Sequence, residues 1–272
     1  MLTVDIPTHV SPSQVSQLAQ CPARYLLGRA YPPETTPVWN VLGTAVHTAI
    51  QAAIEDGITL YDTISLVKTL IGEHDPERIA FQSRTTKDNL VATAVGCVET
   101  WWDQVHPTGK NRLPEYEALG WPPQTESRFN LPGGPPVVVI LDALYSTAFG
   151  PIVVDWKTGA RSRSRMLQLY IYWWVLRQAG IAKPEHRPRG WFHHLRSGKL
   201  QPFDWYPGDA VIQAQLWAAD RTKRAGHYDP APNDFCPVCQ SQPHCPLYTG
   251  DMTDLDNARK AVRWTEPERN VA

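Results

Sequence analysis

Residues 137–172 read VVVILDALYSTAFGPIVVDWKTGARSRSRMLQLYIY, and this stretch decides the fold. Two short runs within it, VVVIL and IVV, are rich in β-branched residues and bounded by proline and glycine, as in strands buried on both faces. Each run ends in an acid, Asp142 and Asp155, and a carboxylate beside a buried strand needs a positively charged partner. Lys157 lies two residues beyond Asp155 and projects from the same face of its strand. The pattern predicts that two aspartates and a lysine meet at one edge of a sheet.

Such a set of side chains suits metal-dependent cleavage of a phosphodiester. Carboxylate oxygens hold Mg²⁺ or Mn²⁺, the cation offsets charge that builds on the phosphate and lowers the pKa of a bound water, and an ammonium group orients that water. An ordinary hairpin with acids on its surface is the alternative that this pattern alone leaves open.

At these positions the chain resembles the RecB-like branch of the PD-(D/E)XK nuclease superfamily. The matching residues are Asp142, the run DWKTG that contains Asp155 and Lys157, and the pair Gln168 and Tyr172 on the next predicted helix. The resemblance implies an α/β fold with a restriction-endonuclease-like core, in which helices flank a mixed central sheet. It also implies a helical insertion and an iron–sulfur clasp near the C-terminus.

The motif G-x-x-x-H, which ends at His47, adds a third ligand to the implied metal site. By itself a single histidine on an apolar helix is more often a hydrogen-bonded core residue. The resemblance implies that His47, Asp142 and Asp155 bind one or two Mg²⁺ or Mn²⁺ ions, with the Trp156 carbonyl as a further ligand. It also makes Asp142, Asp155 and Lys157 the catalytic residues. Neutral imidazole suits Mn²⁺ better than Mg²⁺.

Several residues near this site are candidates for contact with nucleic acid. Gln168 and Tyr172 share a helical face, and the family resemblance implies that they contact DNA or position the lysine. Three arginines that precede this helix predict a phosphate cradle at its N-terminus, with a solvated basic loop as the alternative. Glu126, in a predicted strand, either assists the metal through water or pairs with Arg128 or another basic side chain on the surface. The three arginines are Arg161, Arg163 and Arg165.

Cys236, Cys239 and Cys245 form a C-x2-C-x5-C cluster that predicts a bound metal or metal cluster. His244 with these thiols would suffice for a zinc site. Cys21, on a helix predicted to begin at Ser11, supplies a distant fourth thiol. Four such cysteines resemble the [4Fe–4S] frame of AddB-type and CRISPR-associated exonucleases, in which the cluster is structural.

The bulk properties are those of a globular chain. With 272 residues and 42% hydrophobic content, it is long enough for one well-packed domain, expected at 1–249, with a loose tail at 250–272. No run approaches the roughly 18–20 apolar residues of a membrane span, and no signal peptide is evident, so we expect a cytoplasmic protein with no membrane partner. Cys97, on a predicted helix, is expected to be a buried thiol. The net charge of −1 means that any nucleic-acid surface is a local patch.

These expectations combine into a metal-dependent DNA exonuclease that prefers single strands. The resemblance implies a role in DNA recombination or repair, or in CRISPR spacer acquisition, with recombination or CRISPR-adaptation proteins as partners and a phage or host gene as the source. Two alternatives stay open: an endonuclease or spacer-processing partner of an integrase complex, and a non-catalytic nucleic-acid-binding subunit.

Overall fold

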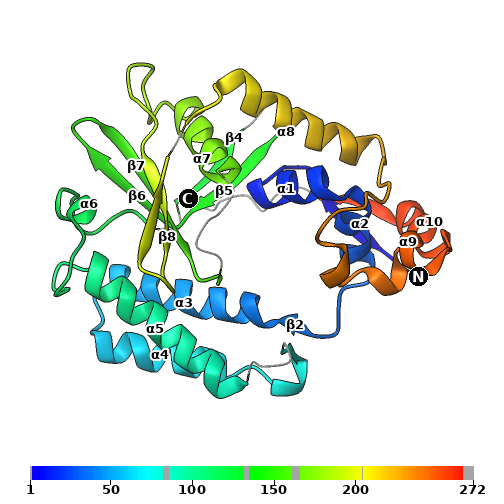
Figure 1. The fold of residues 1–272 in the computed structure, drawn as a ribbon. Helices are drawn as coiled ribbons and strands as arrows, with labels where there is room; N and C mark the ends of the chain where they lie inside the picture. Colours follow the sequence, from blue (N-terminus) through cyan, green and yellow to red (C-terminus); the bar gives the residue numbers. More distant parts are fainter. Residues whose placement is uncertain are drawn as a thin grey trace. The chain divides into compact units, whose positions relative to one another are not determined.

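The computed structural model describes residues 2–81, 86–125, 127–131, 135–160, 166–203 and 205–265. The chain is a mixed α/β protein that divides into two compact units (Figure 1). Unit 1 comprises Met1–Pro33, Phe129–Val139 and Pro207–Ala272, and unit 2 comprises Glu34–Arg128 and Ile140–Tyr206. Both units therefore combine segments that are far apart in the sequence, where the sequence suggested one domain at 1–249. None of the described helices is long and apolar enough to cross a membrane.

A four-stranded mixed sheet forms the centre of unit 2, with the order β6-β7-β8-β9. The β6–β7 and β8–β9 pairs are antiparallel, and the β7–β8 pair is parallel. Strand β7 is buried along nearly its whole length, as its run of Ile and Val predicts. The predicted mixed sheet is thereby confirmed. Its strands are β6 (Ala143–Thr147), β7 (Gly150–Lys157), β8 (Gly190–His194) and β9 (Lys199–Pro202).

Helices cover both faces of this sheet. Helices α3, α4 and α5 lie together on one face, and α7 lies on the other (Figure 1). Alternate residues of β7, among them Val154 and Trp156, join the core formed with α3, α4 and α5. The helices of unit 2 are α3 (Val38–Glu55), α4 (Leu60–Gly72), α5 (Lys87–Val105), α6 (Pro114–Glu117) and α7 (Leu167–Gln178). Unit 2 also contains a short parallel pair of strands, β2 (Thr36–Pro37) and β3 (Ile79–Ala80), and the 3-10 turn η1 (Pro76–Arg78).

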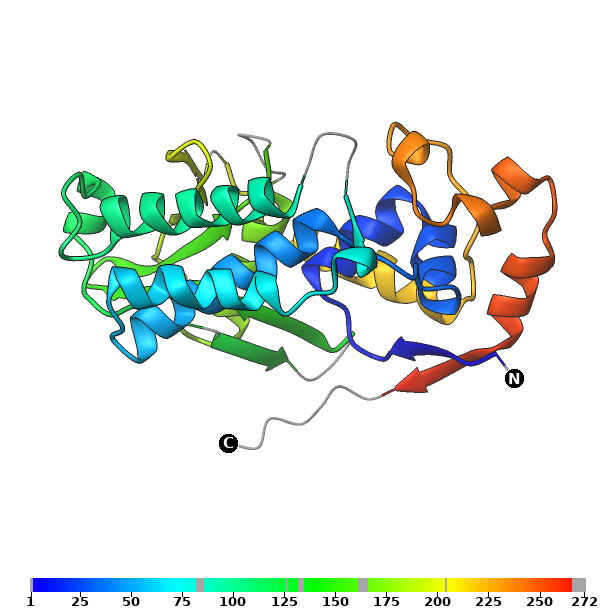
Figure 2. The same ribbon diagram turned by 90° about the horizontal axis from the view of Figure 1, so that it is seen from below.

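Unit 1 brings the two ends of the chain together. Strand β1 (Val4–Pro7) pairs in parallel with β10 (Val262–Thr265), and the two lie side by side in Figure 2. Helix α2 packs against α10, and α1 packs against α8. The buried Lys223 ammonium donates to the backbone carbonyls of Pro7 and His9 at 2.9 and 2.6 Å. The helices are α1 (Pro12–Gln20), α2 (Pro22–Ala30), α8 (Asp209–Arg224), α9 (Pro246–Thr249) and α10 (Thr253–Lys260), with 3-10 turns η2 (Cys236–Val238) and η3 (Gln242–His244).

The ends of unit 1 differ from the expectation in two respects. The helix predicted from Ser11 breaks at Cys21, because Pro22 forces the preceding residue into an extended conformation and begins a second helix. Cys21 is therefore at a junction and not within a helix.

Residues 253–265, expected in a loose tail, form α10 and β10, since Leu255 and Ala258 are fully buried. A further pair of strands, β4 (Ser127–Leu131) and β5 (Val137–Leu141), forms its own two-stranded sheet.

A buried polar network lies between β8 and the helical layer of unit 2. His193 is fully buried, its Nδ1 accepts from the Tyr116 hydroxyl at 3.0 Å, and its Nε2 donates to the Gln104 side-chain oxygen at 2.9 Å. The Tyr116 hydroxyl itself accepts from the Trp191 indole at 2.9 Å. Each ring nitrogen of a neutral His193 therefore has a partner. Burial, helped by the neighbouring His194, lowers the pKa of His193 to about 3.

We predict that His193 makes the protein sensitive to acid. The unfolded chain protonates this histidine near its ordinary pKa of about 6.5, whereas the folded chain does so only near 3. Between these values the unfolded state binds more protons than the folded state. The free energy of unfolding therefore decreases as the pH is lowered, by up to about 1.4 kcal/mol per pH unit. Urea unfolding of wild type and His193→Gln between pH 6.5 and 4.5 measures this slope. The variant should show the shallower slope, and equal slopes would contradict the assignment.

Candidate functional site

The two aspartates of unit 2 face each other because of the β6–β7 register. Ala143 pairs with Val154 in this antiparallel ladder, so Asp142, the residue before β6, lies opposite Asp155. One Asp142 carboxylate oxygen accepts a hydrogen bond from the Trp156 backbone amide at 2.8 Å. This bond holds the Asp142 side chain against β7, and the predicted convergence of the two acids is present in the fold.

His47 approaches Asp142 from helix α3. Its Nδ1 lies 3.3 Å from the second Asp142 carboxylate oxygen. Gly43, one helical turn earlier, faces the residue that follows β7: a Cβ on Gly43 would lie 3.6 Å from the Thr158 hydroxyl, an ordinary van der Waals distance. Of the G-x-x-x-H motif, it is His47 that contacts the acid.

Asp155 is 2% exposed and has three side-chain partners. The Lys157 ammonium lies 2.5 Å from one carboxylate oxygen. The other oxygen accepts from the Gln168 amide at 2.7 Å and from the Tyr172 hydroxyl at 3.4 Å. Both partners come from α7, whose four-residue spacing places them on one face.

The amide of Gln168 connects the acid to the lysine. Its side-chain oxygen accepts from the Lys157 ammonium at 2.8 Å, and its nitrogen donates to Asp155 and to the Tyr172 hydroxyl at 2.7 and 2.6 Å. An ammonium can only donate, so these contacts fix the orientation of the amide. The Lys157 ammonium also lies 4.8 Å from the centre of the Phe192 ring. Lys157 is thereby held between an acid, an amide and an aromatic face.

Burial and mutual charge shift the ionisation of these groups. Burial raises the pKa of Asp155 to about 6, although Lys157 opposes the shift. Burial alone would raise the pKa of Asp142 and lower that of His47, but their mutual attraction outweighs it. The net result is a lowered pKa for Asp142 and a raised pKa for His47. Both shifts have the direction expected of an imidazolium and a carboxylate that stabilise each other.

The donors of a cation site are thus adjacent but are not arranged around a common centre. Within the described ranges, no three His, Cys, Asp or Glu side chains form a group that would hold a metal ion as placed. His47, Asp142 and Trp156 line one small pocket, while the Asp155 carboxylate is turned toward Lys157. Four other predicted site residues lie outside the described ranges: Glu126, Arg161, Arg163 and Arg165.

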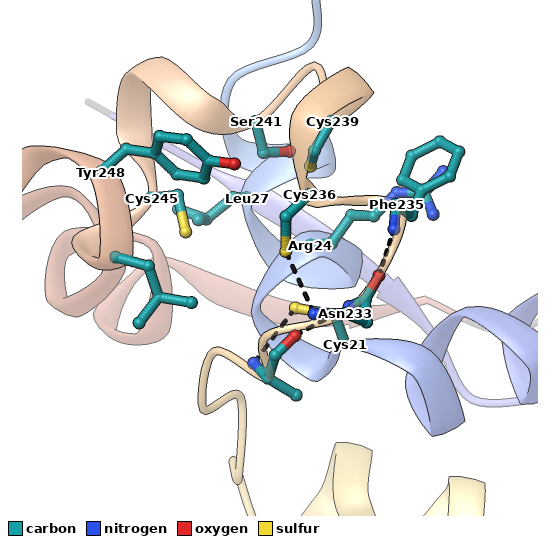
Figure 3. A pocket seen from close by; sticks show the side chains of 12 residues that line it. Cys21, Arg24, Leu27, Asn233, Phe235, Cys236, Cys239, Ser241, Cys245 and Tyr248 are labelled. Atoms are coloured by element: carbon teal, nitrogen blue, oxygen red, sulfur yellow. Dashed lines mark hydrogen bonds between the residues drawn. The ribbon is translucent and has the colours of Figure 1, made fainter.

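The four predicted cluster cysteines line a single pocket in unit 1. Figure 3 shows Cys21 at the α1–α2 junction together with Cys236, Cys239 and Cys245 from the loop that follows α8. Burial raises the pKa of the Cys245 thiol, and the three other thiols lie near enough to raise it further. Two backbone amides, of Ala231 and Asn233, donate to the sulfurs of Cys21 and Cys236 at 3.5 and 3.3 Å.

The remaining candidates near the cysteines are placed differently. His244 is not among the residues that line the pocket. Its Nδ1 lies 2.7 Å from an Asp254 carboxylate oxygen, and its ring stacks on Tyr31 with centroids 4.1 Å apart. These contacts tie the cysteine loop to α10 and α2. Cys97 is 1% exposed in unit 2, and burial raises its pKa to about 11, as expected of an inert buried thiol.

The comparison with protein families agrees with this geometry. Residues 9–246 match the model of the PD-(D/E)XK nuclease superfamily. The chain therefore belongs to the PD-(D/E)XK nuclease superfamily, whose members are nucleases that use Mg²⁺ or Mn²⁺. A search of curated proteins found no match to this chain.

Two residues that the sequence reading passed over also line the pocket of His47 and Asp142. They are Gln51, one helical turn after His47, and Thr125. The four-residue spacing from His47 was the available signal for Gln51. Thr125 carried no such signal, because only the fold brings it to α3.

We predict that Gln168→Glu destabilises the protein more than the same change made elsewhere on α7. The new carboxyl would meet Asp155 in place of a donor, at a cost of roughly 1–3 kcal/mol in the free energy of unfolding at neutral pH. The like charge raises the folded-state pKa of the pair above the unfolded value, so this loss shrinks as the pH falls through that pKa. Thermal unfolding in a chelator at pH 8 and pH 5 measures both effects.

Gln178→Glu, at the exposed end of α7, is the matched control. It should lower the melting temperature only slightly. A Gln168→Glu variant that melts like this control at both pH values would show that the amide does not bridge Asp155 and Lys157 in solution.

Proposed function

We propose that the protein is a metal-dependent DNA exonuclease that prefers single-stranded DNA. The observation that carries the proposal is the register that sets Asp142 opposite Asp155, with His47 against one acid and Lys157 against the other. The preference for single strands and the place of the enzyme, in recombination, repair or CRISPR spacer acquisition, rest on the resemblance to the RecB-like branch.

The donor chemistry fits a hard divalent cation. His47, Asp142 and Asp155 would hold Mg²⁺ or Mn²⁺, with the Trp156 carbonyl as a further oxygen ligand. A cation bound there would offset charge on the scissile phosphate and lower the pKa of the attacking water. Burial raises the pKa of Asp155 despite Lys157, and a bound cation would offset this cost of keeping the carboxylate charged.

Lys157 would serve the reacting water. Its ammonium, held by Asp155 and by the Gln168 oxygen, has its position set before substrate arrives. In that position it can donate a hydrogen bond that orients the attacking water or stabilises negative charge on the phosphate. Gln168 and Tyr172 would position the lysine from α7, and the same face of α7 would lie beside the DNA.

We further propose that Cys21, Cys236, Cys239 and Cys245 hold a [4Fe–4S] cluster with a structural role. Their convergence on one pocket supports this proposal, as do the amide groups that donate to two of the sulfurs. Cys21 lines the pocket with the other three cysteines and His244 does not, which favours Cys21 over His244 as the fourth ligand. The cluster would join the start of the chain to its last hundred residues.

Substitution of Asp155 by Asn should abolish Mn²⁺-dependent digestion of end-labelled single-stranded DNA. The variant keeps the shape of the side chain but loses the charge that would hold the cation, so we expect a fall of at least about 100-fold in rate. Lys157→Met should have a similar effect. The digestion rate over a Mn²⁺ titration is the measurement.

Glu99→Gln, an equivalent change at an exposed position on α5, should leave the rate unchanged. If Asp155→Asn digests as fast as this control, the nuclease site is not where we place it. Circular single strands test the exonuclease assignment separately: an exonuclease leaves them intact, and their cleavage would identify an endonuclease.

The cysteine proposal predicts that the purified protein is brown and contains iron and sulfide in equal amounts. Cys21→Ser should lose both, because it removes one of four ligands, while Cys97→Ser, in unit 2, should retain them. Iron, zinc and acid-labile sulfide analysis measures the outcome. A colourless protein with one zinc ion would identify the zinc alternative instead, and metal loss in His244→Ala but not in Cys21→Ser would exclude Cys21 as a ligand.

A further inference from the structure

Three further polar side chains, those of Gln51, Glu55 and Thr125, form a hydrogen-bonded group at the pocket beside His47 and Asp142. His47, Gln51 and Glu55 follow one another at four-residue intervals on α3 and so share one face of the helix. The Gln51 side-chain nitrogen donates to both Glu55 carboxylate oxygens, at 3.2 and 3.3 Å. The Thr125 hydroxyl donates to the same carboxylate. Gln51 and Thr125 line the pocket together with His47 and Asp142.

The position of Thr125 is set by backbone bonds to the central sheet. Gln124 and Leu144 exchange two backbone hydrogen bonds of 2.9 and 2.8 Å, which attach this segment to β6 two residues after Asp142. Thr125 is therefore held at the start of β6, where its hydroxyl bonds to Glu55. The three segments that meet here are α3, the segment around Thr125 and the start of β6.

These contacts determine the orientation of the Gln51 side-chain amide. Glu55 as a carboxylate only accepts hydrogen bonds, so the amide nitrogen points toward it and the oxygen points away. Among the described residues, Glu55 is the one side-chain partner of Gln51. The negative charge on Glu55 also polarises the amide and makes its oxygen a stronger acceptor. With its nitrogen turned toward Glu55, the Gln51 amide has an oxygen with no side-chain donor among the described residues, and Gln51 itself lines the pocket beside His47 and Asp142.

From this arrangement we propose that Gln51 is a positioning residue for the divalent cation and accepts a hydrogen bond from water that hydrates it. The proposal rests on the proposed function, because it assumes a cation at His47 and Asp142. Phosphate oxygens are themselves acceptors, so a free carbonyl oxygen does not suit the substrate's phosphate. A hydrated Mg²⁺ or Mn²⁺ presents donors, and Mg²⁺ in particular keeps several waters when it binds. Glu55 and Thr125 hold the amide in place for this contact.

The test is a Mn²⁺ binding isotherm, followed by electron paramagnetic resonance of the free ion, without DNA. Gln51→Ala should weaken binding roughly 10-fold, in the range found for groups that orient metal ligands. Glu55→Gln should weaken binding less, because the amide then loses its fixed orientation and not its oxygen. Thr48→Ala, exposed on the same helix and outside the pocket, is the matched control and should bind like wild type. Melting temperatures in a chelator establish that each variant is folded.

The Gln51→Glu variant distinguishes two roles of Gln51: contact with the hydrated cation, and a purely structural hydrogen bond to Glu55. The added carboxyl repels Glu55, so a structural role predicts that this variant is less stable and binds Mn²⁺ no better than Gln51→Ala. Our proposal predicts that it binds Mn²⁺ at least as tightly as wild type, because the new charge faces the cation. In activity assays, Gln51→Ala should need more Mn²⁺ for half-maximal rate but reach a near wild-type rate at saturation.

Asp142→Asn separates this inference from the proposed function. If Asp142→Asn loses Mn²⁺ binding while Gln51→Ala binds like wild type, the role of Gln51 is wrong and the metal centre stands. If neither change alters the isotherm, both the metal centre and the role of Gln51 are wrong.

Discussion

The register of the β6–β7 hairpin is the constraint on which the candidate site depends. A shift of one residue would turn Asp155 and Lys157 toward the core of α3, α4 and α5 and would bring Trp156 out of it. The buried apolar residues of β7 fix this register, because Ile152, Val154 and Trp156 fill the helical side of the sheet. The same register therefore determines both the packing of the core and the placement of the acids. The free energy gained by packing many apolar side chains offsets the cost of burying the carboxylates.

The charges of the site balance in a way that suits the proposed chemistry. Two carboxylates face one ammonium and one imidazole, and the raised pKa of His47 means that the imidazole favours its charged form. A divalent cation at this site would displace the imidazole proton, since a nitrogen ligand must be neutral. The exchange of one proton for two positive charges leaves the set with a net charge of about +1, by formal counting. A phosphodiester group carries the opposite charge, so the same exchange would prepare the site for its substrate.

The sequence predicted the chemistry of the site better than the path of the chain. The meeting of Asp142, Asp155 and Lys157 follows from a short-range rule, strand alternation, whereas the place of Gln168 and Tyr172 beside them came from the family resemblance and helical spacing gave only their shared face. The structure brings all five together. The break at Cys21 also follows a local rule, the effect of Pro22, which the reading of one continuous helix overlooked.

Other features have no local signal. The β1–β10 pairing joins segments from opposite ends of the sequence, and β10 itself is largely exposed, so neither hydrophobic pattern nor turn chemistry marks it. The same holds for Thr125, whose contact with Glu55 exists only after the sheet has formed. The division into two units could not be predicted from the sequence either, because each unit combines segments that are far apart along the chain.

The closure of unit 1 explains why a cysteine site would belong there. Cys21 and the C-terminal cysteines are more than 200 residues apart in sequence, and the segments between them include all of unit 2. Noncovalent contacts already hold these ends: β1 on β10, α2 on α10, and the Lys223 ammonium on the carbonyls of Pro7 and His9. A crosslink across so long a loop removes more unfolded-chain entropy than a local one, on the order of 5 kcal/mol by analogy with a disulfide. Burial lowers the pKa of Lys223 to about 8, so its contact with the two carbonyls carries a desolvation cost. A group bound by all four thiols, if present, would add a crosslink to these noncovalent contacts.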